Sequence, residues 1–366
     1  MRAPWKVMRG IVMRARGLRI NPCDCRKDNC EILNLEKCNF IKIVLMLSVI
    51  FYHSICYWSR YGWFTDYPDD PSVVLDFLCG YLNSIHVYGF AVISGYLFYY
   101  SKYEKGTRSS FFSSVIHRGK RLLWPYFATA AFWVAPFYCI YFGVNENTLI
   151  HKYVLAEAPS QLWFLVMLFT LFCLFSLLSD FFYHENAFWG IVISCSCYAI
   201  GLWGSRRYLN VFQIWTALKY IVFFYIGFYL RKKQNNFLYS IPWFAYFLVH
   251  LGSFLVVFYG SPSQKMGDVL TFVCNIAGAL AVIMLLNRCD ADKLCKHVLY
   301  QFMKRHNLVM YCFHQQLVYI SLTLFSHKLP NPLLVVVNFV FATLVSGLIA
   351  VIISKLRICK TVYGYR

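Results

Sequence analysis

The sequence predicts an all-α protein: a polytopic bundle of about ten transmembrane helices with both termini in the cytoplasm. Of its 366 residues, 59% are hydrophobic, 20% are aromatic and only 14% are charged, whereas soluble domains carry about 25% charged residues. The apolar runs are continuous rather than alternating, which favours helices over a membrane β-barrel. The basic residues alternate from one connection to the next, as they do in chains that cross a membrane repeatedly.

Each predicted span is an apolar run of about the 20 residues needed to cross a bilayer. Lipid offers the backbone no hydrogen bonds, so each run must satisfy its own backbone as a helix. The predicted spans are 41–58, 73–100, 122–142, 160–182, 187–204, 215–230, 240–259, 269–286, 308–326 and 333–354.

The formal charge of +19 is explained by topology and not by a nucleic-acid partner. Nine basic residues precede the first span and six lie in 101–121, whereas the connections between these basic segments hold few. The positive-inside rule therefore places both termini in the cytoplasm. It also makes the protein a multi-pass protein of the cell (inner) membrane. The external loop after the first span is acidic and contains Asp66, Asp69 and Asp70.

Every connection is too short to fold as a separate unit, and no period of 20 to 50 residues repeats. We therefore divide the chain into three parts. Residues 1–38 form a basic, cysteine-containing cytoplasmic arm, residues 39–355 form one membrane domain, and residues 356–366 form a basic cytoplasmic tail.

The fifteen cysteines do not indicate a disulfide framework. Most lie within predicted spans, where cysteine behaves as a small apolar residue, among them Cys56, Cys139, Cys173 and Cys312. Four more lie near the N-terminus and could in principle bind zinc: Cys23, Cys25, Cys30 and Cys38. Their spacing fits no usual paired knuckle, so reduced thiols are favoured and no metal is expected.

Lys42 and His53 form the sharpest polar pair within a span. They are eleven residues apart, which places them on one stripe of a helix with about 16 Å between them along the axis. A cation at the cytoplasmic rim and a base in the interior would suit an anionic substrate whose reactive end extends inward. The alternative is that Lys42 reaches the headgroups and His53 bonds a neighbouring helix.

The second span contains His86, Ser94 and Gly95 among apolar residues. Close helix packing explains Ser94 and Gly95 adequately, because small residues let helices approach one another. His86 requires a polar partner or a water-filled cavity.

Arg118 and Arg121 precede the third span in the sequence HRGKRLLWPYF. Topology alone could explain their charge. The functional alternative is phosphate binding, because the guanidinium fork matches phosphate oxygens.

Two further segments carry polar or interfacial side chains. Gln161 and Trp163 precede the fourth span, where an interfacial tryptophan belt is the ordinary explanation. His314, Gln315 and Gln316 are consecutive within the ninth span, where three polar side chains are costly without partners.

Taken in order, these fragments resemble membrane-bound acyltransferase family 3, in the sugar O-acetyltransferase branch that includes fucose 4-O-acetylase. The resemblance covers about residues 34–354. Its motifs are a basic residue before a histidine in the first span, a histidine leading to SGYLF, the R-x-x-R-L-L-x-P-Y element, LWFL, YIGFYL and a late Y-x-x-H. The residues that match them include Lys42, His53, His86, Ser94, Gly95, Arg118, Arg121, Pro125, Tyr126, Trp163, Gly227, Tyr311 and His314.

Three positions depart from the family pattern. Lys42 stands where the family usually has arginine, and so lacks the bidentate fork. Asn39 replaces a common aspartate, and Tyr88 replaces the proline usual after the second-span histidine. These changes bear on how the donor is held more than on the class of chemistry.

The resemblance implies transfer of an acyl group, expected to be acetyl, from cytoplasmic acetyl-CoA to a hydroxyl of an envelope or exopolysaccharide sugar. His53 is the candidate catalytic base, because a neutral buried imidazole can accept the hydroxyl proton. Lys42, Arg118 and Arg121 would hold the CoA phosphates. Ser94 is a hydrogen-bond donor or a packing residue. Asp76 and Glu157 are the carboxylates nearest to His53 by topology, but neither is assigned to orient it. Membrane lipid is a further expected partner.

Three alternatives stay open on the sequence. A glycan or lipid-linked sugar transporter or flippase would use the same helices and polar groups without binding CoA, although the two related halves common in transporters are absent. A structural or sensory protein would leave the three span histidines unexplained. A glycosyltransferase usually needs acidic metal ligands, which are scarce within the spans.

Overall fold

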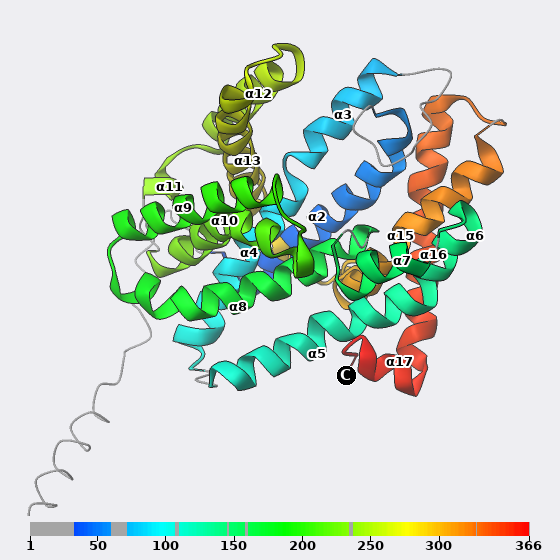
Figure 1. Cartoon of the computed structure of the whole chain (residues 1–366), viewed down its shortest axis with the longest axis horizontal. Helices are drawn as coiled ribbons and strands as arrows, with labels where there is room; N and C mark the ends of the chain where they lie inside the picture. The colour runs from blue at the N-terminus through cyan, green and yellow to red at the C-terminus, as the bar shows by residue number, and fades with distance from the viewer. Residues whose placement is uncertain are drawn as a thin grey trace, which may run out of the picture. The chain divides into compact units, whose positions relative to one another are not determined.

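The chain is mostly helical in the part that its computed structural model describes, which is 33–59, 72–106, 110–144, 146–157, 160–233, 237–326 and 328–365 (Figure 1). No strand occurs within these ranges. Ile32–Arg366 forms one compact unit. The predicted arm cysteines Cys23, Cys25 and Cys30 and the loop carboxylates Asp66, Asp69 and Asp70 lie outside the described residues.

The α-helices are α2 (Leu35–Ile55), α3 (Val73–Asn83), α4 (His86–Tyr99), α5 (Phe111–Thr129), α6 (Ala135–Phe142), α7 (Glu146–Leu149), α8 (Trp163–His184), α9 (Ala187–Ser205), α10 (Ile214–Lys232), α11 (Phe237–Ser240), α12 (Trp243–Tyr259), α13 (Gln264–Asn287), α14 (Ala291–Leu294), α15 (Val298–Phe325), α16 (Asn331–Lys355) and α17 (Arg357–Val362). Shorter 3-10 turns are Cys56–Trp58, Ser160–Leu162 and Val211–Gln213. Single π-helical turns are Tyr100–Glu104, Ala130–Val134 and Ile150–Val154.

The predicted bundle of membrane-crossing helices is confirmed. Nine helical segments of the described chain are long and apolar enough to cross a bilayer, and α12 is a shorter apolar helix of 17 residues. Together they correspond to the ten predicted spans. Several helices extend past the apolar run at their basic end: α5 begins at Phe111 and α15 at Val298. Charged residues at the interface end the apolar run without ending the helix.

The first helix begins inside the stretch that we assigned to the arm. Asn34 caps α2, its Oδ1 accepting a hydrogen bond of 2.7 Å from the backbone N–H of Lys37. An asparagine cap satisfies one of the donors that every helix leaves unpaired at its start. The division of the chain at residue 38 stays a prediction.

The second span differs from the continuous helix that we predicted, because it consists of α3 and α4, separated at Ser84 and Ile85. Ile85 has a non-helical backbone, with φ −120° and ψ −56°. The backbone N–H of Ile85 donates to the carbonyl of Leu82 in a tight turn. A break inside a membrane is tolerated where protein covers it. This break positions His86 as the first residue of α4.

Two glycines let α4 and α10 cross in direct contact. A Cβ on Gly95 would lie 1.9 Å from the carbonyl oxygen of Phe224, and a Cβ on Gly227 would lie 1.8 Å from that of Val92. Neither distance is possible for real atoms. The packing role predicted for Gly95 therefore has a direct geometric basis, and Gly227 is its counterpart on the opposing helix.

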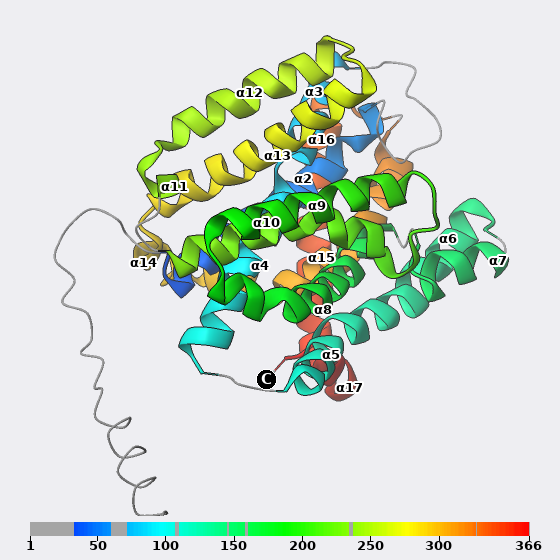
Figure 2. The ribbon, with the colours of Figure 1, turned by 60° about the vertical axis from the view of Figure 1, so that its left-hand side comes forward.

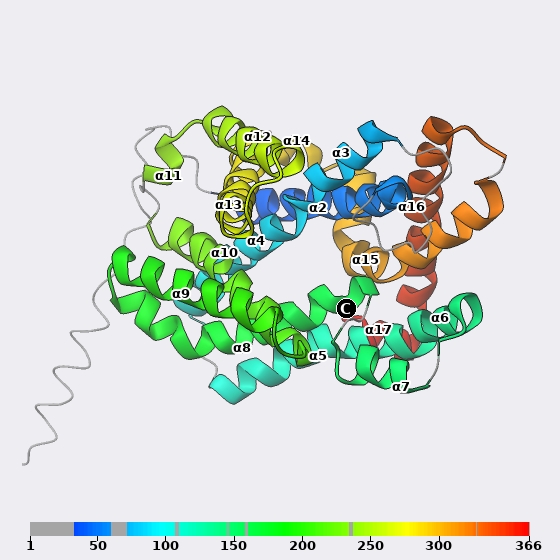
Figure 3. The ribbon, with the colours of Figure 1, turned by 45° about the horizontal axis from the view of Figure 1, so that its top comes forward.

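Neighbouring helices pair along their lengths. α12 packs on α13, and Figure 2 shows the two running side by side. α15 packs on α16 and on α2. In Figure 3, α2 lies between α13 and α16, and it contacts both. The first helix is thus surrounded by later ones, which explains the burial of its inward face.

Polar contacts tie together the helix ends that carry the basic residues. Arg231 binds Glu104 through two nitrogens and also donates to the hydroxyl of Tyr96 at 2.7 Å. At the start of α2 and α15, Lys304 forms an ion pair of 2.7 Å with Glu36. These contacts gather the ends of α2, α4, α10 and α15 on one face of the bundle.

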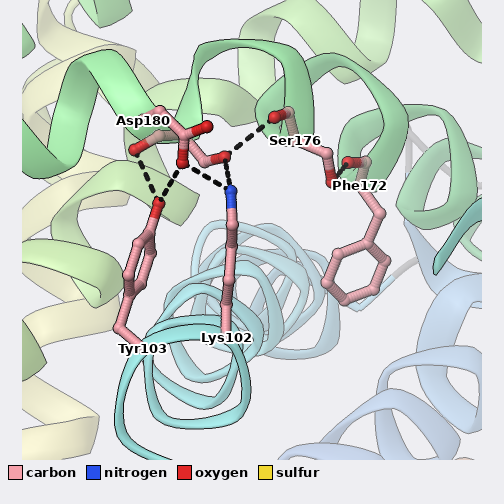
Figure 4. Close-up of polar contacts among 6 residues, drawn as sticks. Lys102, Tyr103, Phe172, Ser176 and Asp180 are labelled. Atoms are coloured by element: carbon pink, nitrogen blue, oxygen red, sulfur yellow. Dashed lines mark hydrogen bonds and ion pairs between the residues drawn. The ribbon is translucent and has the colours of Figure 1, made fainter. Parts of the chain in front are cut away.

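A third contact of this kind joins the π-helical turn Tyr100–Glu104 to the end of α8. Figure 4 shows Lys102 and Tyr103 reaching from that turn toward Asp180. The ammonium of Lys102 lies 2.7 Å from Asp180 Oδ1, and the hydroxyl of Tyr103 donates to the same carboxylate at 3.0 Å. Asp180 is 74% exposed, so the pair stabilises the bundle only slightly.

Candidate functional site

His53 and His314 form a buried imidazole pair in the bundle interior. Nδ1 of His53, in the last turns of α2, lies 2.8 Å from Nε2 of His314, in the middle of α15. His53 is 9% exposed and His314 is fully buried. These two residues are 261 positions apart in the chain. The sequence placed them on separate spans and did not predict their contact.

The hydrogen bonds define which nitrogen of each ring carries the proton. Nδ1 of His314 lies 2.6 Å from the backbone carbonyl of Tyr311, and a carbonyl can only accept. In the neutral ring, Nε2 of His314 is therefore the acceptor. His53 must then donate from Nδ1. The basic lone pair of His53 consequently lies on Nε2.

His86 is the third imidazole of the cluster. Its Nδ1 donates to the carbonyl of Leu82 at 2.5 Å, one turn before the helix break. This carbonyl is the polar partner that the sequence required for His86. The ring is 2% exposed and lies near both other histidines, which interact with it electrostatically.

Tyr52 connects the histidines to a cavity. Its ring lies 4.9 Å from that of His53 and 5.0 Å from that of His86. The same tyrosine lines a cavity of about 180 Å³ between α3, α12 and α13. Polar side chains in the cavity wall are Ser59, Asn83, Ser84, Thr271 and Asn275, and aromatic ones include Tyr52 and Tyr88.

Sequence reasoning missed both Tyr52 and the cavity. The available signal was a set of small polar residues at matching depth in two spans: Asn83 and Ser84 in the second, and Thr271 and Asn275 in the eighth. No local pattern links these spans, so the cavity emerges only from their packing.

The polar run of α15 is satisfied by residues that precede α8. Nε2 of Gln161 donates to Oε1 of Gln316 at 2.6 Å and to the carbonyl of Cys312 at 2.8 Å. Gln316 returns a bond of 3.1 Å to Gln161, and the hydroxyl of Tyr311 donates to the backbone carbonyl of Gln161. This network holds α15, and with it His314, in a defined rotation.

Trp163 begins α8 and packs toward the aromatic wall of the site. Its ring lies 6.1 Å from that of Tyr220, which stacks on Tyr88 with centroids 5.1 Å apart. Trp163 therefore lies one ring away from a cavity-lining residue. Tyr88, the position where the family usually has proline, is part of that wall.

Two of the predicted cations lie near each other at the basic end of the bundle. Lys42 interacts electrostatically with Arg121 and Lys304, which come from α5 and α15. Asn307 of α15 donates to the backbone carbonyl of Lys42 at 3.4 Å. Within the described ranges, Lys42 and Arg121 form no ion pair. Their positive charges lie close together, and the carboxylate of Glu36 also acts on Lys42.

The surroundings of Arg118 differ from those of Lys42 and Arg121, because aromatic rings cover the Arg118 guanidinium. Its Cζ lies 3.9 Å from the ring centroid of Phe172 and 4.9 Å from that of Phe98. Such cation–π packing joins α5 to α8 and α4. Arg118 therefore has a structural role that Arg121, which is exposed, does not share.

The remaining candidates are resolved by their neighbours. Ser94 is half-buried beside the Gly95 crossing, which agrees with packing. Asp76 accepts a hydrogen bond of 3.2 Å from Ser59, and Glu157 lies 3.5 Å from His151. The hydrogen-bond partner that the structure shows for His53 is the imidazole of His314. No cluster of three or more metal-ligating side chains occurs among the described residues.

These features define a class of protein: a helical membrane protein with a buried, hydrogen-bonded imidazole pair behind a cationic rim. A model of the acyltransferase domain, acyltransferase family 3, matches residues 36–353. The chain belongs to this family and is an acyltransferase that transfers groups other than aminoacyl groups. No curated protein and no solved structure gave a match. Family membership decides for acyl transfer over the transporter alternative.

Proposed function

We propose that the protein moves an acyl group, with cytoplasmic acetyl-CoA as the donor, to a hydroxyl of a cell-envelope or exopolysaccharide sugar, in the inner membrane. The single observation that carries this proposal is the buried His53–His314 pair, in which His53 lies on the same stripe of α2 as Lys42. A thioester carbonyl is already activated, so the protein must supply a base, stabilise the oxyanion and hold the phosphates.

In the proposed reaction, Nε2 of His53 accepts the proton of the attacking sugar hydroxyl. The oxygen adds to the thioester carbonyl, the carbon–sulfur bond breaks, and the CoA thiolate leaves with the proton returned by His53. While charged, His53 donates from Nδ1 to neutral His314. This hydrogen bond stabilises the imidazolium without placing a carboxylate in the membrane interior, where a buried charge is costly.

The two substrates would approach from opposite directions. Lys42 and Arg121 would hold the CoA phosphates, and the pantetheine arm would cover the distance of about 16 Å from Lys42 to His53. The cavity beside Tyr52 would hold the acceptor. Its amide and hydroxyl side chains, Asn83, Thr271 and Asn275, match the alternating donors and acceptors of a sugar.

Replacing His53 with alanine tests the base directly. We expect His53→Ala to insert and fold but to lose nearly all transfer, because the hydroxyl then has no proton acceptor; general-base catalysis contributes on the order of 10²- to 10⁴-fold. The measurement is mass spectrometry of envelope glycans from cells with and without each variant, in which a missing acetyl mass identifies the acceptor. His184→Ala, at an exposed histidine ending α8, is the matched control. Near-normal acetylation in His53→Ala would remove the assignment.

Replacing Arg121 with alanine tests the donor site. We expect weaker acyl-CoA binding by about 10-fold with little change in kcat, because the interaction is with the phosphates and not the reacting atoms. Lys293→Ala is the control: it also removes one cation, at a side chain that is 85% exposed and paired with Asp290. Equal donor affinity in the two variants would reject the phosphate role of Arg121.

A further inference from the structure

A pair of cysteine thiols lies beside the candidate site. Sγ of Cys56 and Sγ of Cys79 are 3.6 Å apart. Cys56 begins the turn that follows α2, and Cys79 lies in α3. The exposed fraction is 0% for Cys56 and 2% for Cys79.

The two cysteines are free thiols in this structure, with their sulfurs near each other. A disulfide bond is about 2.05 Å long, so the sulfurs need to approach by about 1.5 Å, which side-chain rotation can supply. The two backbones are already fixed relative to each other, because Ser59 donates to Asp76 at 3.2 Å just beyond the pair.

The two thiols also lie at the right side of the membrane for oxidation. The charge pattern puts the end of α2 and the start of α3 on the non-cytoplasmic side, where disulfides form and persist. Cys38 also lies in α2, the helix that precedes Cys56, but near the cytoplasmic start of that helix. The structure thus contains an internal reference thiol in the reducing compartment.

We infer that Cys56 and Cys79 form a disulfide bond that joins the turn after α2 to α3. Before α2 and α3 pack together and bury the sulfurs, a thiolate of one cysteine attacks a low-molecular-weight disulfide of the compartment and releases one thiol. The second cysteine attacks the mixed disulfide and releases the other thiol. The two cysteines together lose two electrons and two protons, and the external disulfide is reduced to two thiols.

The bond would fix one wall of the acceptor cavity. Cys79 lines the cavity directly, and the side chain of Cys56 is hydrogen-bonded to Tyr52, whose ring packs on His53 and His86. A covalent link at this point holds Tyr52 between the cavity and the histidines. The bond itself depends on the packing and the topology and does not depend on which group is transferred.

Differential thiol labelling tests the bond without any activity measurement. Membranes are denatured in detergent with N-ethylmaleimide and no reductant, then reduced and labelled with a heavier maleimide, and the peptides are read by mass spectrometry. We expect Cys56 and Cys79 to carry only the second label and Cys38 only the first. The first label on both Cys56 and Cys79 would overturn the proposal. The second label on Cys38 as well would indicate unspecific oxidation and would also overturn it.

A substitution shows whether the two cysteines protect each other. In Cys79→Ser, which keeps the size of the buried side chain, we expect Cys56 to take the first label completely. If Cys56 still required reduction before labelling, its partner would be another sulfur and the assignment to Cys79 would be wrong. Because denaturation precedes labelling, the result does not require the variant to fold fully.

Discussion

At the scale of single residues, the proposed site has an imidazole where many hydrolases and transferases use a carboxylate. His314 is held by the carbonyl of Tyr311 and accepts from His53. A neutral acceptor stabilises a protonated base less than a carboxylate does, but it avoids burying a negative charge among apolar helices. The pair is therefore a solution suited to the interior of a membrane protein.

This role makes His314 a positioning residue whose loss has a specific signature. We expect His314→Leu to lower kcat by about 10- to 100-fold, the usual cost of losing an orienting partner, with the affinity for acyl-CoA unchanged. His314→Gln keeps an acceptor near the position of Nε2 and should recover part of the rate. Steady-state kinetics on the purified variants would measure this. Equal kcat in the leucine and glutamine variants would show that the hydrogen bond does not matter.

At the scale of helices, the break between α3 and α4 and the glycine crossing of α4 with α10 together position His86 and Tyr88. At the break, the backbone carbonyl of Leu82 accepts a hydrogen bond from the side chain of His86. The crossing brings α10 close enough for Tyr220 to stack on Tyr88. Neither the break nor the crossing changes the length of the apolar run. For this reason the sequence predicted one uninterrupted span here.

The crossing can be tested with two glycines in helices of the same bundle. Gly227→Ala would place a methyl group 1.8 Å from the carbonyl oxygen of Val92, so we expect the helices to separate at a cost of about 1–3 kcal/mol. At Gly252, in α12, an added Cβ would meet nothing within 4 Å, so Gly252→Ala should be neutral or slightly stabilising. Thermal unfolding in detergent measures both. Equal melting temperatures would contradict the direct contact.

At the scale of the whole molecule, the alternation of charge along the chain and the contacts among helix ends identify the same face of the bundle as the basic one. The ends tied together by Arg231, Glu104, Lys304 and Glu36 are those that the positive-inside rule assigns to the cytoplasm. The tail helix α17 leads to Tyr363 and Tyr365, which hydrogen-bond Thr129 and His306 at 2.7 Å each. The tail is thus attached to α5 and α15.

The assigned orientation predicts the outcome of reporter fusions. A phosphatase that is active only outside the cytoplasm should be active when fused after residue 262, in the turn between α12 and α13, and inactive when fused after residue 365. A fluorescent protein that matures only in the cytoplasm should give the opposite pattern. The reverse result for either position would overturn the orientation.

The sequence by itself determined the class of fold, the approximate spans, the basic side of the bundle and the histidines that require a role. These follow from local properties: apolar length, charge and the cost of a polar group in lipid. The tertiary structure decided which of these residues meet. His53 with His314, Gln161 with Gln316, and Cys56 with Cys79 are pairs from separate helical segments, and their contacts depend on helix rotation and crossing. Side-chain packing between distant segments sets rotation and crossing, and no run of consecutive residues encodes it.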